Sequence, residues 1–379
     1  MATKAAGEKF SLKDQLFNRE RVQYLADRFH SADASFEKKR FVSQTMKGFS
    51  ALELKQRIAH IADQLNEFLS ANYKQATKQI VAALPPPLDP TQTDDDFGDF
   101  IFAPLGEFVA RNGLKKGDVA VSLKTLKAIT QRFSMEDAIR EFILTHPEAT
   151  LVELTKWAND PNYHVRRLVS EGTRPFLPWS KRVNLPASAT IPFLDSLHAD
   201  PTRYVTRSVA NHLNDISKID AALVLETLTR WQKTGKQAPA ELAWMNRHAL
   251  RTLVKKGDAK ALKFLGFRRD PKIKIANFQL ENEQIQPGQA VEFSFDITAE
   301  REESLLIDFV IDFVKANGTR APKVHKLKQI ELASGQSQTL KKRHVLRANA
   351  TTYKLYPGTH RLSLQVNGNI LETLCFELQ

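Results

Sequence analysis

Apolar and polar positions follow two different periods along this chain, and the change between them divides the sequence in two. From about Ser11 to Phe267, apolar residues recur every three or four positions, a spacing typical of helices with one buried face. From Asp270 onward they alternate with polar residues in short runs, which is typical of half-buried strands. The pattern therefore predicts a helical domain over residues 1–269 and a β domain over residues 270–379.

The helical part contains an internal repeat. The segment DPNYHVRRLVSE begins at Asp160, and DPTRYVTRSVAN follows about 40 residues later with Val and Arg at matching positions. The same phase aligns Arg167 with Arg207 and Arg247, and extends backwards to Lys127. A period near 40 residues with paired helices is typical of HEAT-like solenoids. Stacked helix pairs bury a common core and present a long concave face, which would then carry one cation per repeat.

The β part is predicted to form an immunoglobulin-like sandwich, because about seven short strands fit into its length. The pairs Asn317-Gly318 and Asn367-Gly368 are the best candidates for hairpin turns. The segments PKVHKLKQ and LKKRH supply cations that we expect on loops. The predicted fold class is thus mainly α: a HEAT-like helical solenoid with a C-terminal, all-β, immunoglobulin-like sandwich.

Charge points to an anionic partner. The formal net charge is +12 and the sequence pI is about 9.6. The part after Lys272 is nearly balanced, so the helical part carries most of the excess. A basic helical face suits a polyanion such as DNA. A surplus that only aids solubility is the alternative.

Cysteine usage and the N-terminal segment suggest a cytoplasmic protein. The only cysteine, Cys375, excludes an internal disulfide, and we expect it to be a small buried strand residue. The first residues, MATKAAGEKF, lack the apolar stretch of a signal peptide. No run is long enough to cross a bilayer, so no membrane association is predicted.

Several kinds of chemistry have no recognisable motif in the sequence. There is no Gly-rich phosphate loop, HExxH, paired CxxC or nucleophile elbow, so we predict neither a cofactor nor a metal. The acidic run TQTDDDFGD follows the helix-breaking PPPLDP and is interpreted as a surface loop between helices. A nuclease, which would use a convergent acidic metal cluster, is therefore the weakest of the functions considered.

One dense segment, from Trp157 to Trp179, holds most of the candidate chemistry. His164, Arg167 and Glu171 are spaced to share one face of a helix that begins after Asp160-Pro161 and ends by Gly172. Arg167 and Glu171 could also be only a solvated ion pair.

Aromatic and basic residues flank this helix. Trp157 is expected in the core, whereas Trp179 lies in a basic, proline-stiffened loop and could either pack inward or stack on a nucleotide. Arg166 and Arg174 add cations that could contact phosphates.

A further carboxylate, Glu136, lies in the preceding segment RFSMEDAIREFI. It falls in the first turn of a predicted helix whose N-cap is Ser134. Helix capping alone would explain this carboxylate.

The string HVRRLVSEGTRPFLPW, the segments FSMEDAIREFI and LELKQRIAHIADQL, and the repeat period together resemble the bacterial alkylpurine DNA glycosylases of the AlkC type. The resemblance covers essentially the whole chain and includes the C-terminal immunoglobulin-like domain of one AlkC branch. It implies that Glu136 and Glu171 are active-site carboxylates, that Arg167 contacts DNA, and that Trp179 lies beside the lesion. The related AlkD type has a tryptophan and an arginine where Asn211 and Asn214 stand here, so no second tryptophan is assigned.

The resemblance implies a monomeric enzyme of base excision repair that hydrolyses the N-glycosidic bond of cationic alkylated bases in duplex DNA. Such bases are N3-methyladenine and N3-methylcytosine. Their positive charge makes them good leaving groups, so no general acid is needed, and a carboxylate can stabilise the sugar cation and orient the water. The residues predicted to bind nucleic acid are His164, Arg166, Arg167, Arg174, Trp179, Arg207 and Arg247.

A non-catalytic HEAT-type adaptor is the main alternative. It would explain the solenoid, the charge and the sandwich equally well. It would not explain two carboxylates, arginines and a tryptophan concentrated between Glu136 and Trp179.

Overall fold

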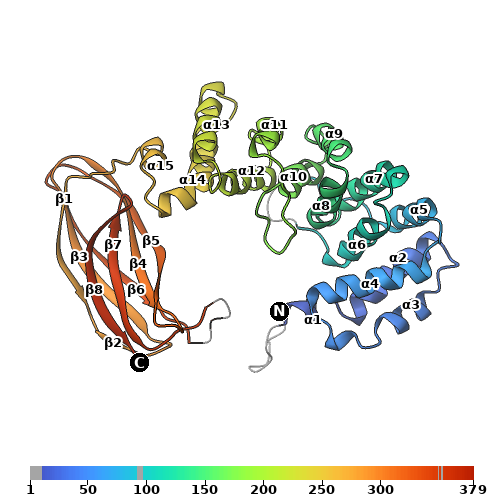
Figure 1. Cartoon of the computed structure of the whole chain (residues 1–379), viewed down its shortest axis with the longest axis horizontal. Coiled ribbons are helices and arrows are strands. Elements are labelled where there is room, and N and C mark those ends of the chain that lie inside the picture. The colour runs from blue at the N-terminus through green and yellow to red at the C-terminus, as the bar shows by residue number, and fades with distance from the viewer. Residues whose placement is uncertain (1–10, 92–96, 349, 351–352) are drawn as a thin grey trace. The chain divides into compact units, whose positions relative to one another are not determined.

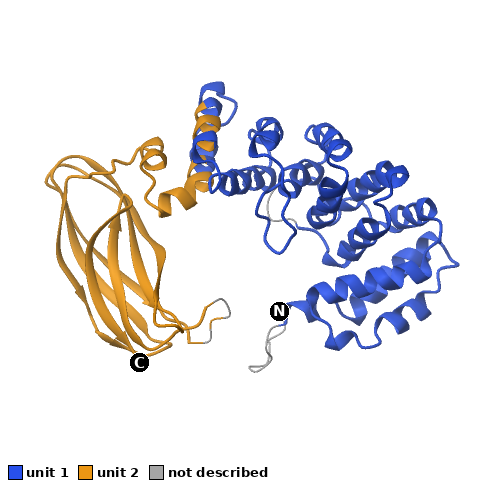
Figure 2. Cartoon of the chain, viewed as in Figure 1, with its two compact units in different colours: residues 1–223, 230–245 blue, residues 224–229, 246–379 orange. Residues whose placement is uncertain are grey.

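The computed structural model describes residues 11–91, 97–348, 350 and 353–379, and these form two compact units. One comprises residues up to 223 together with 230–245, and the other comprises residues 224–229 together with 246–379 (Figure 2). Helices give way to strands between Phe264 and Ile273. The domain division at residue 269 remains a prediction, because the last helices before it group with the strands.

Helices make up the first part of the chain, as Figure 1 shows. Short 3-10 turns occur at Phe49–Ala51, Phe100–Phe102 and Lys116–Asp118. The α-helices are α1 (Leu12–Leu16), α2 (Arg19–Ala32), α3 (Lys38–Thr45), α4 (Leu54–Phe68), α5 (Tyr73–Ala83), α6 (Ala103–Asn112), α7 (Val119–Thr130), α8 (Glu136–Thr145), α9 (Pro147–Trp157), α10 (Tyr163–Gly172), α11 (Ala187–Leu197), α12 (Arg203–Ile216), α13 (Ala221–Thr234), α14 (Pro239–Lys255) and α15 (Ala259–Phe264).

These helices form the two layers of a solenoid. In one layer α4, α6, α8, α10 and α12 pack on one another in turn, and in the other α5 packs on α7 and α7 on α9. Figure 1 shows the first layer along one side of the solenoid and the second along the other. The predicted helical solenoid is therefore confirmed. Trp157, at the end of α9, is buried as expected.

The repeat phase is wrong for Lys127. This residue lies in α7, in the second layer, whereas Arg167 and Arg207 lie in α10 and α12 of the first. The loop over residues 173–186 lengthens the repeat between α10 and α12, while α8 and α10 begin far fewer than 40 residues apart. Loop length varies between stacked pairs without disturbing their packing, so a period read from one pair does not transfer to the next.

The β part is a two-sheet sandwich, which confirms the predicted fold class. Its strands are β1 (Ile273–Leu280), β2 (Gln284–Ile285), β3 (Ala290–Ala299), β4 (Glu303–Val314), β5 (Arg320–Leu332), β6 (Ser337–Val345), β7 (Gly358–Val366) and β8 (Asn369–Leu378). One sheet has the order β1-β3-β6 and the other β2-β8-β7-β4-β5, with antiparallel pairing except between β2 and β8. Alternate residues from both sheets, such as Phe295 and Phe309, fill the shared core.

The hairpin between β7 and β8 has the turn that its sequence demands. Asn367 and Gly368 both have positive φ, +45° and +81°, as a two-residue type I′ turn requires. Gly318 also has positive φ in the turn between β4 and β5. Both Asn-Gly pairs thus lie in hairpins.

Two expectations for the β part are wrong. The basic segments PKVHKLKQ and LKKRH lie within β5 and β6 rather than on loops. Cys375 is exposed, because the alternation of β8 turns the neighbouring Phe376 into the core and leaves Cys375 on the outer face.

Candidate active site

Helix α10 has the boundaries expected from its sequence. The side chain of Asn162 caps its N-terminus by accepting hydrogen bonds from the backbone N–H groups of His164 and Val165. The helix ends at Gly172, where a Cβ would lie 2.6 Å from Cγ2 of Ile139 in α8. The missing side chain lets the end of α10 approach α8, and this approach brings together residues from both helices.

Across this contact, Arg167 of α10 binds Glu136 of α8. Its Nη1 donates to Oε2 of Glu136 at 2.9 Å, and the hydroxyl of Ser134 donates to the same oxygen at 2.7 Å. The Glu136 side chain is 30% exposed, whereas that of Arg167 is 8% exposed. Within the described residues, the hydrogen bonds of Glu136 reach Oε2 alone. No hydrogen bond from the described residues reaches its second oxygen.

Helix capping does not explain Glu136. The N-cap of α8 is Met135, one residue later than the predicted Ser134, and no side chain caps this helix end. Glu136 is the first residue of the helix, and its carboxylate bonds to Arg167 and Ser134 instead of to the backbone. The charge still lies at the favourable end of the helix dipole.

Glu171 occupies a deeper position. Its Oε1 accepts from Nη1 of Arg174 at 2.6 Å and lies 3.7 Å from Nη2 of Arg167, while Oε2 accepts from the hydroxyl of Ser208 at 2.6 Å. The side chains of Glu171 and Arg167 are both buried, so the interpretation as a solvated ion pair is wrong. Burial favours the neutral acid, but Arg167 and Arg174 outweigh it and hold the pKa of Glu171 below its usual value.

The ionic contacts continue into α12. Nε of Arg174 donates to Asp215 at 2.9 Å, and Asp215 also accepts from Lys218 at 2.8 Å. Acidic and basic groups therefore alternate through the first layer of the solenoid, in the order Glu136, Arg167, Glu171, Arg174, Asp215 and Lys218. A buried charge is stable only when its oppositely charged neighbours are present. This row of six charged residues therefore holds Glu136, at its partly exposed end, in a fixed position.

Arg167 is also held by aromatic rings. Its guanidinium lies 4.3 Å from the ring centroid of Tyr204 in α12 and 5.9 Å from that of Phe97. Burial alone would lower the pKa of Arg167, but Glu136 and Glu171 raise it above the ordinary value. Arg167 is therefore a permanent cation behind Glu136.

Arg140, which the sequence did not single out, supports the loop after α10. Its buried guanidinium donates to the carbonyls of Gly172 at 2.9 Å, Arg174 at 3.0 Å and Lys181 at 2.5 Å. The loop over residues 173–186 carries Trp179, which is 81% exposed and has a φ of +64°. The indole therefore faces outward, and of the two alternatives left open, inward packing is wrong.

The remaining predicted residues lie in different surroundings. Arg166 binds Asp200 through Nε at 2.6 Å and a backbone carbonyl of Asp160 at 2.8 Å. His164 is buried beside Tyr204, with ring centroids 5.5 Å apart. Arg207 is half-buried in α12, and Arg247 is exposed in α14, in the second unit. For these residues, contact with nucleic acid stays a prediction.

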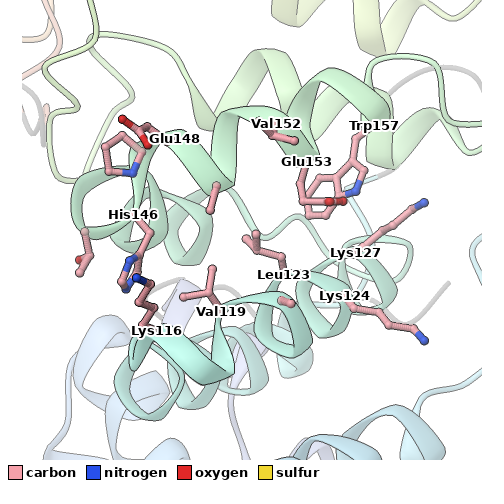
Figure 3. Close-up of a pocket in the computed structure, with 14 residues that line it drawn as sticks. Lys116, Val119, Leu123, Lys124, Lys127, His146, Glu148, Val152, Glu153 and Trp157 are labelled. Atoms are coloured by element: carbon pink, nitrogen blue, oxygen red, sulfur yellow. The ribbon is translucent and has the colours of Figure 1, made fainter.

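A separate groove of about 1110 Å³ lies between α7 and α9 (Figure 3). Lys116, Lys124 and Lys127 lie along one wall, Glu148 and Glu153 along the other, and Trp157 at one end. The groove belongs to the second layer and includes none of the predicted site residues. Lys127 here pairs with Asp160 at 2.5 Å.

The described residues include neither a cluster of three metal-binding side chains nor a helix long and apolar enough to span a membrane. The chemistry of the site in these residues is that of a partly exposed carboxylate backed by a fixed cation, with an exposed tryptophan on the adjoining loop.

The same architecture occurs in a solved structure of known activity. The structure of Pseudomonas fluorescens alkylpurine DNA glycosylase AlkC bound to DNA containing an abasic site analog superimposes with a TM-score of 0.87. The match is 34% identical and covers 97% of this chain and 99% of that one. The chain belongs to the AlkC-type family of alkylpurine DNA glycosylases.

Two further matches place the chain in the branch of this AlkC-type family that has a C-terminal immunoglobulin-like domain. The uncharacterized protein YhaZ of Bacillus subtilis (strain 168) is 32% identical over 370 residues, which cover 96% of this chain and 98% of YhaZ. The family model for the C-terminal Ig-like domain of YhaZ matches residues 274–379. The resemblance inferred from the sequence is thus confirmed at the level of the family.

Proposed function

We propose that this AlkC-type chain is a DNA glycosylase of base excision repair that removes cationic alkylated bases, such as N3-methyladenine and N3-methylcytosine, from duplex DNA. The observation that carries the proposal is the pairing of Glu136 with Arg167. It places a carboxylate whose side chain is 30% exposed at the end of a buried ionic row, in a chain that closely matches an alkylpurine DNA glycosylase.

The proposed reaction is hydrolysis of the N-glycosidic bond. The bond from the sugar C1′ to the base nitrogen breaks with both electrons going to the base, which leaves as a neutral molecule because it began as a cation. The sugar becomes an oxocarbenium-like cation, which the carboxylate of Glu136 stabilises. Water then adds to C1′ and its proton passes to solvent or to Glu136, so that an abasic site remains.

The two carboxylates have different roles in this proposal. From the sequence alone they are equivalent candidates, but both oxygens of Glu171 are occupied and its side chain is buried. We therefore assign Glu136 the contact with the sugar cation. Glu171 acts through Arg167 and Arg174, which it holds in place, and is a positioning residue.

Trp179 is proposed to stack on the alkylated base. An aromatic face beside a cation contributes about 0.5–2 kcal/mol, so a charged lesion would bind better than a normal base. Outward exposure of the indole and its place near the first turn of α8 support this role. Such stacking does not require the base to be turned fully out of the duplex, and we propose that bending of the DNA presents the lesion.

The remaining cations are proposed to bind the DNA backbone. Arg207 and Arg247 belong to the helices, and Lys326 and Lys328 are exposed on β5 of the sandwich. Phosphate contacts position a duplex without reading its sequence, which suits an enzyme that must find damage anywhere. If the sandwich assists in this way, replacing both lysines by Gln should weaken duplex binding and leave the melting temperature unchanged.

Base release from methylated duplex DNA tests the proposal. We propose that the protein acts as a monomer in the cytosol. The purified full chain, pretreated with a chelator, should release N3-methyladenine and leave abasic sites. A folded protein that binds the duplex and releases no base would instead favour the adaptor function.

A further inference from the structure

Trp179 lies in a strained backbone conformation. Its φ of +64° belongs to the left-handed region, which bulky residues rarely adopt. A non-glycine residue stays in this region only when surrounding contacts hold it there. The contacts around Trp179 therefore indicate what fixes the direction of the exposed indole.

Three contacts to α8 hold the residues just after Trp179. The hydroxyl of Ser180 donates to Asp137. Nζ of Lys181 pairs with Glu141 at 2.8 Å, and its carbonyl accepts from Arg140. These contacts place the loop against α8, but none of them reaches the peptide group of Trp179 itself.

Within that peptide group, the N–H of Ser180 donates to the carbonyl of Leu177 at 3.4 Å, and the contact from outside the loop comes from α4. Nζ of Lys55 donates a hydrogen bond to the carbonyl oxygen of Trp179 and lies 3.9 Å from a carboxylate oxygen of Asp137. Helix α6 packs between α4 and α8 in the same layer, so this lysine reaches the loop from two helices away. The Lys55 side chain is 60% exposed.

We propose that Lys55 is a positioning residue for Trp179. It stabilises the left-handed peptide by binding its carbonyl, and the carboxylate of Asp137 keeps the ammonium group in place. Asp137 follows Glu136 in α8, so the same helix end carries the carboxylate and orients the aromatic ring. The role in catalysis rests on the proposed glycosylase function, whereas the effect on Trp179 does not.

The alternative role for Lys55 is to bind a DNA phosphate directly. The two roles predict different results for Lys55→Gln. A phosphate ligand lost from the interface lowers the log–log salt slope of duplex binding by about 0.9 and weakens excision whether or not Trp179 is present. A positioning residue leaves the slope unchanged, and its effect disappears once Trp179 is removed.

The first measurement is spectroscopic and requires no enzymatic activity. The chain has four tryptophans, so labelling with 5-fluorotryptophan gives four ¹⁹F NMR resonances, and Trp179→Ala identifies one of them. We expect Lys55→Gln, whose side chain is too short to bring its amide donor to this carbonyl, to shift or broaden this resonance alone. Lys55→Arg, whose longer side chain can still donate to the carbonyl, should leave the resonance at its wild-type position. Lys78→Gln, which removes an exposed lysine of α5, is the charge-matched control. An unchanged Trp179 resonance in Lys55→Gln would overturn the proposal.

The second measurement is a double-mutant cycle of single-turnover excision from methylated duplex. We expect Lys55→Gln to slow excision about tenfold, because misplacement by about 1 Å can cost up to a hundredfold. In the Trp179→Ala background the same change should have no effect. If Lys55→Gln slows excision by the same factor with and without Trp179, the positioning role is overturned. A wild-type chain without any excision would instead refute the glycosylase function, and the NMR result would still decide the role of Lys55.

Discussion

Arg167 donates a 2.9 Å hydrogen bond to Oε2 of Glu136 and lies 3.7 Å from Oε1 of Glu171, so a single buried cation connects an exposed carboxylate to a buried one. The two acids differ in burial while sharing this partner. Their substitutions should therefore have different consequences.

Replacing Glu136 by Gln should abolish most of the activity and leave the fold intact. The change removes the charge that stabilises the sugar cation, and we expect single-turnover excision to fall by about two orders of magnitude or more. Stability should fall less than in Glu171→Gln, because Glu136 is partly exposed, the amide oxygen of Gln can still accept from Arg167, and Arg167 keeps Glu171 as its second partner. Glu148→Gln, which removes an exposed acid from the first turn of α9, is the matched control and should retain full activity. Full-rate excision by Glu136→Gln would end its catalytic assignment.

Replacing Glu171 by Gln should lower both stability and activity. The change leaves Arg167 and Arg174 buried without their shared anion, and loss of one partner from a buried pair costs about 3–5 kcal/mol. We expect a melting temperature lower by several degrees, together with slower excision as Glu136 loses its fixed partner. Thermal melting and single-turnover kinetics on the same samples check this. An unchanged melting temperature with lost activity would instead give Glu171 a direct part in the chemistry.

His212 should make the protein less stable as the solution becomes acidic. Burial, with Arg174 nearby, lowers the pKa of this histidine to about 4. In the unfolded chain its pKa is about 6.5, so between these values the unfolded state binds a proton that the folded state does not. Stability is unaffected above about pH 6.5 and falls as the pH drops towards 4, by roughly 3 kcal/mol. The melting temperature should depend less on pH across this range for His212→Phe than for the wild type.

Glu171 should contribute acid sensitivity in a lower range. Its folded pKa lies below the unfolded value, so its stabilisation is present above about pH 4.3 and is lost as the pH falls through the folded pKa. The loss of stability below pH 4 should be smaller in Glu171→Gln than in the wild type. Urea midpoints at pH 3 and pH 6 measure the difference, and equal differences in the two proteins would contradict the assignment.

Two of the arginines predicted to bind nucleic acid, Arg166 and Arg247, should differ in their effect on DNA binding. Arg247 is exposed, so Arg247→Gln should reduce the log–log salt slope of duplex binding by about 0.9. Arg166 is bound to Asp200 and to backbone carbonyls, so Arg166→Gln should lower the melting temperature and leave the slope unchanged. Fluorescence anisotropy titrations at several salt concentrations check both, and a reversed pattern would show that the ion pair of Arg166 opens on binding.

Features that depend on neighbouring residues could be predicted from the sequence. Asn162 and Gly172 bound α10 because capping and close helix contact are local requirements. Asn367-Gly368 forms the turn between β7 and β8 because both residues tolerate positive φ. The spacing of His164, Arg167 and Glu171 places them on one helix face for the same reason.

Features that depend on how helices stack required the tertiary structure. Lys127 follows the phase of Arg167 in the sequence but lies in the other layer, because loops of different length shift the register between repeats. Ser208 and Asp215 have no sequence signal that pairs them with Glu171 and Arg174, since these contacts exist only where α12 packs on α10.

The difference in burial between Glu136 and Glu171 also required the tertiary structure. Both are acids near arginines in the sequence, and burial alone makes one a partly exposed carboxylate and the other an internal anchor. The bond from Lys55 to Trp179 also joins segments that only folding brings together. Sequence alone determined which chemical groups this family member carries and which helix faces they share. The packing of distant helices decided which of those groups meet solvent, because burial depends on neighbours that no local pattern specifies.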